Sequence, residues 1–307
     1  MLESLTKVLP KCIIEPLQER LNLDKLYEVR LRAGQAVTIN YGGKLYFLSP
    51  QGICQLRQRA IEVDVAMVTE VVVRATDYSL YAVNDQLKTG YLTLQGGVRI
   101  GIAGEVVYGE RGEVKTLKNF SSVNIRVPHE VLGAGDSVYK SCLEVAIFNT
   151  LIVSPPGAGK TTVLRDIARR LSERTPPCNV LVVDERNELA ASFKGVSQTN
   201  IGTHTDVFAN AAKQFAFTAG IRALAPDIII TDELATFVDA SSVEYAASAG
   251  VHIIASCHGR SVEDIKIKSG FKNLVQNRIF KRFVVLSSRE GPGTIEGVYD
   301  ENFVSLG

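Results

Sequence analysis

A stretch rich in glycine, ending in a lysine and two threonines, has the residue types that bind phosphate groups. Its sequence is Ser154-Pro155-Pro156-Gly157-Ala158-Gly159-Lys160-Thr161-Thr162. Glycines let the backbone curl so that successive N–H groups face one anion. The lysine would contact the β and γ phosphates of a nucleotide, and the hydroxyl of Thr161 would bind Mg²⁺. The stretch is therefore predicted to bind a nucleotide, with Thr161 as a metal ligand.

The stretch departs from the pattern GxxxxGK[ST] at its first position, where Ser154 replaces glycine. Serine can still turn there, and Gly157 and Gly159 keep the tight part of the loop. The flanking residues favour the prediction, because an apolar run at 145–153 precedes the stretch and a helix-like segment at 163–171 follows it. That order of strand, loop and helix is what a phosphate-binding loop requires, and it argues against a simple glycine turn before a surface helix.

A second candidate is the acidic pair Asp232-Glu233, which follows the apolar run Ile228-Ile229-Ile230. Asp232 could hold Mg²⁺ directly or through water, and Glu233 could orient an attacking water molecule. The alternative is an acidic helix start, where carboxylates are favoured by the helix dipole. With a phosphate-binding loop upstream, the metal and water site is the better interpretation.

Two more polar segments follow apolar runs. The first, Asp184-Glu185-Arg186-Asn187-Glu188, places three carboxylates in five residues, and one of them could activate water; a solvated acidic loop is the alternative. The second is Ser256-Cys257-His258-Gly259, in which His258 could hydrogen-bond a γ-phosphate or sense its loss. His252 lies within the preceding apolar run and is expected in the core.

Charge developing on a γ-phosphate needs a cation beyond the loop lysine. Taken singly, each candidate arginine is more simply a surface or ion-paired residue; the candidates are Arg126, Arg222, Arg30, Arg32 and Arg99. A basic stretch at 266–282 is most simply a solvated helix face, with a subunit or nucleic-acid contact as the minority interpretation.

The composition limits the possible classes of protein. The chain has 307 residues, 46% of them hydrophobic, and a net charge of +1, so no bulk attraction to nucleic acid or membranes is expected. The five cysteines are scattered and form no CxxC pair, which argues against a disulfide framework or a zinc site. Without a long apolar run or a signal-peptide core, we expect a soluble, cytoplasmic protein that reaches membranes only through a partner.

The pattern of residue types along the sequence changes near residue 130. Before it, hairpin signals at Gly42-Gly43 and Gln95-Gly96-Gly97 and helical segments at 2–21 (broken at Pro10) and 63–75 predict a small α+β domain over residues 1–128. Residues 129–140 are expected to form a linker. Over 141–307, apolar runs alternate with helical segments, which predicts an α/β domain with a mostly parallel sheet. The expected strands are 147–153, 180–183, 228–230, 252–255 and 283–286, and the expected helices are 160–172, 206–224, 238–250 and 261–279.

In their order, these motifs resemble those of the ATPases that power bacterial type II and type IV secretion and pilus assembly: a phosphate-binding loop, an acidic "Asp box", a Walker B glutamate and a "His box". Within that group the whole chain resembles the stage III sporulation protein AA family. The segments that carry this resemblance are 28–32, 96–101, 123–126, 154–157 and 183–188.

The resemblance implies a RecA-like P-loop NTPase core behind the α+β domain, with ATP and Mg²⁺ as cofactors. It further implies an ATPase on the mother-cell side of an endospore-forming bacterium, energising a secretion-like channel. The partners would be further copies of this chain in a ring, a hexamer, and the membrane-embedded stage III sporulation proteins. Arg126 or Arg99 could then complete the site of a neighbouring copy.

One departure leaves the catalytic base open. Secretion ATPases have glycine before the Walker B glutamate, whereas this chain has Asp232. In the secretion ATPases a glutamate of the Asp box is often assigned as the base, so the resemblance implies Glu233 or Glu188 as the base, with Glu185 a weaker candidate. His258 would couple the state of the γ-phosphate to movement. Two other functions remain: a nucleic-acid-binding P-loop ATPase, against which the near-zero net charge counts, and a scaffold that binds ATP to assemble.

Overall fold

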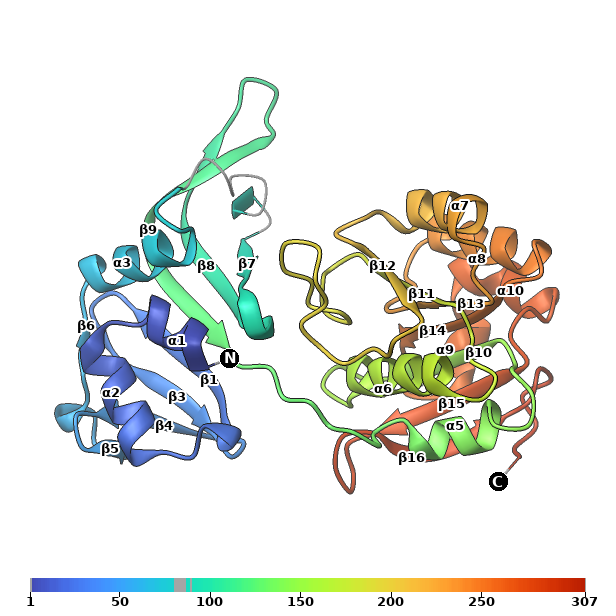
Figure 1. Cartoon of the computed structure of the whole chain (residues 1–307), viewed down its shortest axis with the longest axis horizontal. Helices are drawn as coiled ribbons and strands as arrows, with labels where there is room; N and C mark the ends of the chain where they lie inside the picture. Colours follow the sequence, from blue (N-terminus) through green and yellow to red (C-terminus); the bar gives the residue numbers. More distant parts are fainter. Residues whose placement is uncertain (1, 80–86, 89, 307) are drawn as a thin grey trace. The chain divides into compact units, whose positions relative to one another are not determined.

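The computed structural model describes residues 2–79, 87–88 and 90–306. The chain divides into two compact units, residues 1–129 and 130–307, and each has its own hydrophobic core (Figure 1). Within the described residues, no helix is both long enough and apolar enough to cross a membrane.

The first unit contains a seven-stranded sheet in the order β5-β4-β3-β1-β9-β8-β7, in which all neighbouring strands are antiparallel. Two short strands, β2 and β6, pair separately. The helices are α1 (Leu2–Val8), α2 (Lys11–Arg20) and α3 (Val65–Ala75), and the strands are β1 (Leu26–Arg32), β2 (Gln35–Ala36), β3 (Thr38–Tyr41), β4 (Lys44–Ser49), β5 (Gly52–Cys54), β6 (Glu62–Val63), β7 (Tyr91–Thr93), β8 (Arg99–Tyr108) and β9 (Val114–Arg126).

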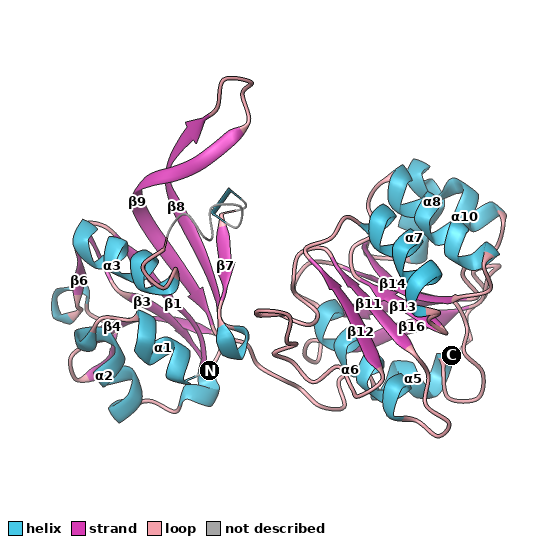
Figure 2. Cartoon of the chain, turned by 45° about the horizontal axis from the view of Figure 1, so that its top comes forward, coloured by secondary structure: helices cyan, strands magenta, loops and turns pink. Residues whose placement is uncertain are grey.

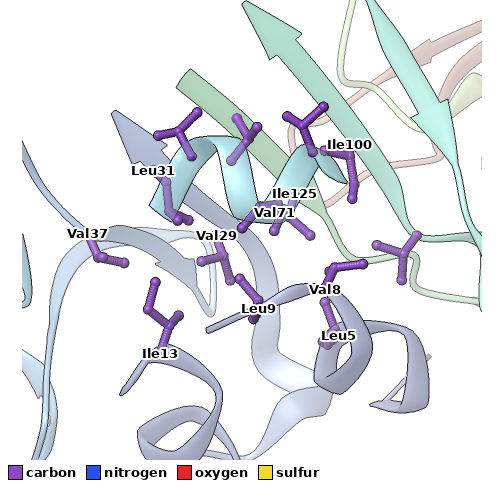
Figure 3. Packing of buried hydrophobic residues seen from close by; sticks show 14 of the residues in the cluster. Leu5, Val8, Leu9, Ile13, Val29, Leu31, Val37, Val71, Ile100 and Ile125 are labelled. Carbon is purple, nitrogen blue, oxygen red and sulfur yellow. The ribbon is translucent and has the colours of Figure 1, made fainter. Parts of the chain in front are cut away.

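The three helices cover one face of this sheet. Figure 3 shows Leu5 and Val8 of α1 and Val71 of α3 packed toward Val29 of β1 and Ile125 of β9. Burial along β1 alternates from Glu28 to Arg32, after a register shift near its start, so the second face of this part carries polar side chains. Burial of the apolar side chains is the main favourable contribution to folding of this unit.

The turns of the first unit follow the sequence signals. The hairpin predicted at Gly42-Gly43 is confirmed by the pairing of β3 with β4, and the second predicted hairpin by the pairing of β7 with β8. Both glycines of the first turn have positive φ, which explains why glycine is needed there. The chain breaks at Pro10 between α1 and α2, as expected. The far end of the β8–β9 hairpin extends beyond the other strands of the sheet (Figures 1 and 2).

The second unit is built around a seven-stranded sheet in the order β12-β11-β13-β14-β10-β15-β16. All neighbours are parallel except β15 and β16. The helices are α5 (Asp136–Cys142), α6 (Lys160–Glu173), α7 (Lys213–Leu224), α8 (Phe237–Ser248), α9 (Val262–Ile267) and α10 (Lys272–Gln276), and the strands are β10 (Thr150–Ser154), β11 (Val180–Asp184), β12 (Thr205–Ala209), β13 (Ile228–Thr231), β14 (His252–His258), β15 (Arg282–Ser287) and β16 (Thr294–Tyr299).

Helices cover both faces of this sheet, as predicted. Residues of α5 and α6 form one core with one face of the strands, and residues of α7 to α10 form a second core with the opposite face (Figure 2). The central strands β10, β11 and β13 are buried along their whole length. That burial explains why they are continuous apolar runs in the sequence.

Three details differ from the sequence-based expectations. The helix expected over 206–224 begins only at Lys213, because residues 205–209 form β12, a partly exposed edge strand without an apolar run. The helix expected over 261–279 is divided into α9 and α10 by a tight turn around Gly270. The range 129–140, expected to be a linker, includes the first residues of α5, whose Val138 and Tyr139 are buried in the core of the second unit.

Candidate nucleotide-binding site

Four strands of the second unit bring polar residues to one edge of the sheet. Strands β11, β13, β14 and β10 are neighbours and parallel, so their carboxyl ends meet at the same edge. Ser154 at the end of β10 lies opposite His258 at the end of β14, and Val183 of β11 lies opposite Thr231 of β13. In open α/β sheets this is the edge at which ligands bind.

The loop between β10 and α6 has the backbone shape that the glycines predict. Gly157 and Gly159 have φ values of +79° and +87°, in the left-handed region, and Gly159 is the N-cap residue of α6. No side chain caps this helix. Its first N–H groups are therefore offered, with the positive end of the helix dipole, to an anion in front of the loop.

The loop is also fixed from behind by the β15–β16 turn. The N–H of Gly293 donates to the carbonyl oxygen of Ala158 at 2.9 Å. A Cβ atom at Gly159 would lie only 3.1 Å from Pro292 Cβ and from Gly293 N. Glycine at position 159 is thus needed both for its φ and for this close approach.

Lys160 lies at the centre of the edge. Its Nζ donates to the carbonyl oxygens of Ser154 and Pro155 at 3.2 and 3.3 Å and lies 3.1 Å from Nδ1 of His258. Burial lowers the pKa of Lys160, while the nearby carboxyl groups of Glu233 and Asp232 oppose that shift. An ammonium group can only donate. Nδ1 of His258 is therefore the acceptor, and its Nε2 can carry a proton.

Glu233 continues this chain of contacts. Its Oε1 lies 3.3 Å from His258 Nε2, and its Oε2 accepts from the guanidinium of Arg186 at 2.5 Å. The Glu233 backbone has a φ of +41°, which a non-glycine residue adopts only when its surroundings enforce it. Here Ser256 enforces it, because its hydroxyl and carbonyl oxygens accept from the N–H groups of Glu233 and Leu234 at 3.1 and 2.7 Å. Lys160, His258, Glu233 and Arg186 thus form a continuous polar chain.

Asp232 is buried, with 5% of its surface exposed. Burial raises the pKa of Asp232 from 3.8 to about 7, and the carboxylates of Asp184, Glu188 and Glu233 act in the same direction, while Lys213 opposes them. Carboxylates packed this closely repel one another unless a cation lies among them. The hydroxyl of Thr161 and the carboxylate of Asp232 are oxygen donors of the kind that Mg²⁺ prefers, usually completed by water and phosphate oxygens. The residues present therefore fit that ion.

We expect the raised pKa of Asp232 to make stability depend on pH. The folded protein holds this proton more tightly than the unfolded chain, so the contribution to stability is full below about pH 4 and is lost as the pH rises through about 7. The rise in pKa from 3.8 to about 7 corresponds to a change of about 4 kcal/mol in the free energy of unfolding over this pH range. Asp232→Asn should remove this dependence. Urea unfolding at pH 5 and pH 8, without metal or nucleotide, measures it, with the exposed Asp206→Asn as control. Parallel pH dependences in wild type and Asp232→Asn would contradict this expectation.

The three carboxylates of the acidic segment after β11 have different contacts. Both oxygens of the buried Asp184 accept backbone N–H groups, from Glu188 at 2.7 Å and from Ala190 at 2.8 Å, so this carboxylate shapes the loop. Glu185 accepts from Nζ of the buried Lys213 at 2.5 Å. Glu188 lies near enough to raise the pKa of Asp232. The structure thus brings Glu188 and Glu233 to the same acidic cluster, while Glu185 is held by a lysine.

The other predicted binding residues have different positions. Thr161 and Thr162 are half-buried in the first turn of α6, and Pro156 is exposed near the tip of the loop. Ser154 is fully buried, and its hydroxyl donates to the carbonyl oxygen of Pro155 at 3.0 Å, so its side chain is engaged inside the loop. Glycine's place is therefore taken by a serine that points inward.

Of the five candidate arginines, one belongs to the second unit and four belong to the first. Arg222 is exposed in the last turn of α7, nine residues beyond Lys213, which contacts Glu185. At 1.5 Å per residue, that places Arg222 about 14 Å farther along the helix axis. Arg126 is the exposed last residue of β9 and belongs to the first unit.

Two further expectations are corrected. His252 is exposed rather than in the core, because it is the first residue of β14 and lies at the opposite edge of the sheet from His258. The basic stretch at 266–282 is not one helix face. Its cations have separate contacts: Lys281 lies 3.6 Å from Glu301, the guanidinium of Arg282 stacks 4.1 Å from the ring of Phe148, and Lys266 lies 4.6 Å from the ring of Phe303.

Some residues of this edge were not predicted. Arg186 and Ser256 lie inside the quoted motifs, but their types alone did not indicate that they would hold Glu233. Lys213 and Arg165, which contact the acidic segment, lie outside any motif. Only the fold brings them there.

The chain resembles known proteins over nearly its whole length. The family model described as "Sporulation stage III, protein AA" matches residues 2–306. The chain is 34% identical to the stage III sporulation protein AA of Bacillus subtilis (strain 168) over 281 residues, covering 91% of this chain and 88% of that protein.

Two solved structures share the fold of this chain. The pilus retraction motor PilT with bound ADP matches 90% of this chain and 78% of its own, with a TM-score of 0.57 and 15% identity. The Legionella pneumophila ATPase DotB matches 85% of this chain and 72% of its own, with a TM-score of 0.55 and 12% identity. At these identities the likeness concerns the fold, which is a mostly parallel RecA-like sheet that follows an N-terminal β-rich unit in the chain.

Proposed function

The chain belongs to the stage III sporulation protein AA family, and on that premise we propose that it is a Mg²⁺-dependent ATPase. One observation carries the proposal. The ammonium of Lys160, the ring of His258 and the carboxylate of Glu233 form one chain of contacts in front of an uncapped helix N-terminus. The residues proposed to bind phosphate, to detect it and to activate water are therefore joined by direct contacts.

Each residue of the chain has a distinct task in this proposal. The loop amides and Lys160 bind the β and γ phosphates of ATP, and for this Lys160 must turn from the carbonyl oxygens of Ser154 and Pro155. That movement breaks the contact of Lys160 with His258, so His258 reports the presence of the γ-phosphate to Glu233. Mg²⁺, held by Thr161 and Asp232, would neutralise charge on the phosphates. Glu233 then accepts the proton of the attacking water.

The competing carboxylates are ranked by their contacts. Glu185 is paired with Lys213, which ties it to α7. Glu188 lies near enough to Asp232 to raise its pKa, and its backbone N–H is held by Asp184, whereas Glu233 contacts His258 directly. We therefore propose Glu233 as the base and Glu188 as the rival to be tested with it.

The assembly is proposed by analogy with the motors of similar fold. In such an assembly a cation for the γ-phosphate would come from another copy in a ring, a hexamer. Arg126 or Arg99 is the candidate. The ring would act on the mother-cell side of the forespore membranes with the membrane-embedded stage III sporulation proteins, and energise a secretion-like channel.

We expect purified wild-type protein to hydrolyse ATP in the presence of Mg²⁺, with a turnover per chain that rises with protein concentration because each site is completed by a neighbour. Phosphate release measured over a hundredfold range of concentration, with and without EDTA, checks this. Turnover that is independent of concentration would contradict the shared site. ATP binding without turnover would favour the scaffold, and turnover only with single-stranded nucleic acid would favour the nucleic-acid-dependent enzyme.

A further inference from the structure

We propose that Arg165 is a positioning residue that fixes the acidic segment 184–190 to the helix bearing the phosphate-binding lysine; this inference rests on the proposed ATPase function. Arg165 lies on α6, five residues beyond Lys160. Its Nε donates to the carbonyl oxygen of Leu189 and one terminal nitrogen donates to that of Glu188, both at 2.9 Å. One guanidinium thus holds two successive peptide groups.

The same segment is also held by residues outside α6. Asp184, at the end of β11, accepts the N–H groups of Glu188 and Ala190. The hydroxyl of Thr199 donates to the carbonyl oxygen of Leu189 at 2.8 Å, beside the Arg165 bond. The backbone at 188–190 is therefore fixed to the sheet through its N–H groups and to α6 through its carbonyl groups.

The chemistry of Arg165 suits this task better than that of lysine. Burial lowers the pKa of Arg165, and the charges of Glu130, Asp184 and Glu188 oppose that shift. Arginine remains protonated in proteins, so its hydrogen bonds stay charge-assisted. Its planar fork donates to both carbonyl oxygens at once, whereas a lysine would present a single ammonium on a flexible chain.

Arg165 fixes the distance between two halves of the site. Lys160 and Thr161 begin α6, and Glu188 belongs to the acidic cluster around Asp232. Because α6 is a continuous helix, Arg165 transmits any displacement of its start to the acidic segment. A catalytic group misplaced by about 1 Å can lose about 100-fold in rate, so this connection sets turnover without touching ATP.

Arg165→Lys tests the inference. We expect kcat for ATP hydrolysis to fall about 10- to 100-fold while KM for ATP changes less than about twofold, because the loop and Lys160 are intact. The matched control is Arg169→Lys, one turn farther along the same helix, whose guanidinium binds Asp166 and Glu173 of α6 itself. Thr199→Val removes the second donor to the Leu189 carbonyl without altering α6, and we expect a smaller fall in kcat in the same direction.

Amide hydrogen exchange provides a readout that needs no hydrolysis. The amides of residues 188 and 190 should exchange faster in Arg165→Lys than in Arg169→Lys, at a temperature where both remain folded. Equal exchange in the two variants, or a fall in kcat that Arg169→Lys reproduces, would overturn the inference. A wild-type protein without turnover would refute the proposed function alone, since the exchange comparison still decides the role of Arg165.

Discussion

Lys160→Ala is expected to abolish ATP hydrolysis and to weaken ATP binding about 10- to 100-fold. The substitution removes the one ammonium group that contacts both the phosphate-binding loop and His258 among the described residues. A hydrogen bond to a charged group contributes about 1.5–3 kcal/mol, which corresponds to that range of affinity. Loss of turnover should be larger than loss of binding, because charge on the γ-phosphate grows in the transition state.

Titration with a fluorescent ATP analogue and an assay of phosphate release measure the two effects separately. Lys281→Ala is a matched control, since Lys281 precedes β15 at the opposite edge of the sheet and pairs with Glu301. Both properties should be close to wild type in that variant. Retention of hydrolysis by Lys160→Ala would show that ATP is not processed at this loop.

Glu233→Gln should separate binding from chemistry. Glutamine keeps the size of the side chain and can still accept from Arg186, so the positive φ at this position and the contacts with Ser256 should persist. It cannot accept the proton of the attacking water, and loss of a general base costs about 100- to 10,000-fold in rate. We therefore expect ATP affinity close to wild type and turnover reduced by at least about 100-fold.

Glu188→Gln and Glu185→Gln, assayed beside it, decide between the carboxylates. Glu233 as the base predicts that only Glu233→Gln traps bound ATP. If Glu188→Gln traps ATP and Glu233→Gln hydrolyses it, the base is Glu188, and Glu233 acts on His258 and Arg186 instead. Turnover equal to wild type in all three variants would show that the acidic cluster takes no part in the reaction.

Much of the second unit could be predicted because its local signals agree with its tertiary structure. Buried parallel strands must be apolar along their length, so β10, β11, β13, β14 and β15 are visible as runs in the sequence. Edge strands carry no such signal, which explains why β12 was assigned to a helix and β16 was not predicted. The glycines at 157 and 159 were predictable for a different reason, because their positive φ values suit few other residues.

The residues of the candidate site were predictable, but the contacts between them were not. Order along the chain already indicated that the loop, the acidic segment, Asp232, Glu233 and His258 would meet, since parallel strands share a carboxyl edge. Whether Ser154 faces the loop or the core depends on packing around it, and the structure buries it. Predicted roles for these residues stay predictions until the variants are measured.

The sequence by itself determined the fold class, the turn of the glycine-rich loop before α6 and the family, because these depend on residue types at fixed local spacing. Only the tertiary structure decided that His258 lies between Lys160 and Glu233, that Arg186 holds Glu233, and that Arg165 holds the acidic segment. Those contacts join residues 23 to 98 positions apart. The order of strands in the sheet and the directions of the side chains determine these contacts. No local pattern in the sequence encodes either of them.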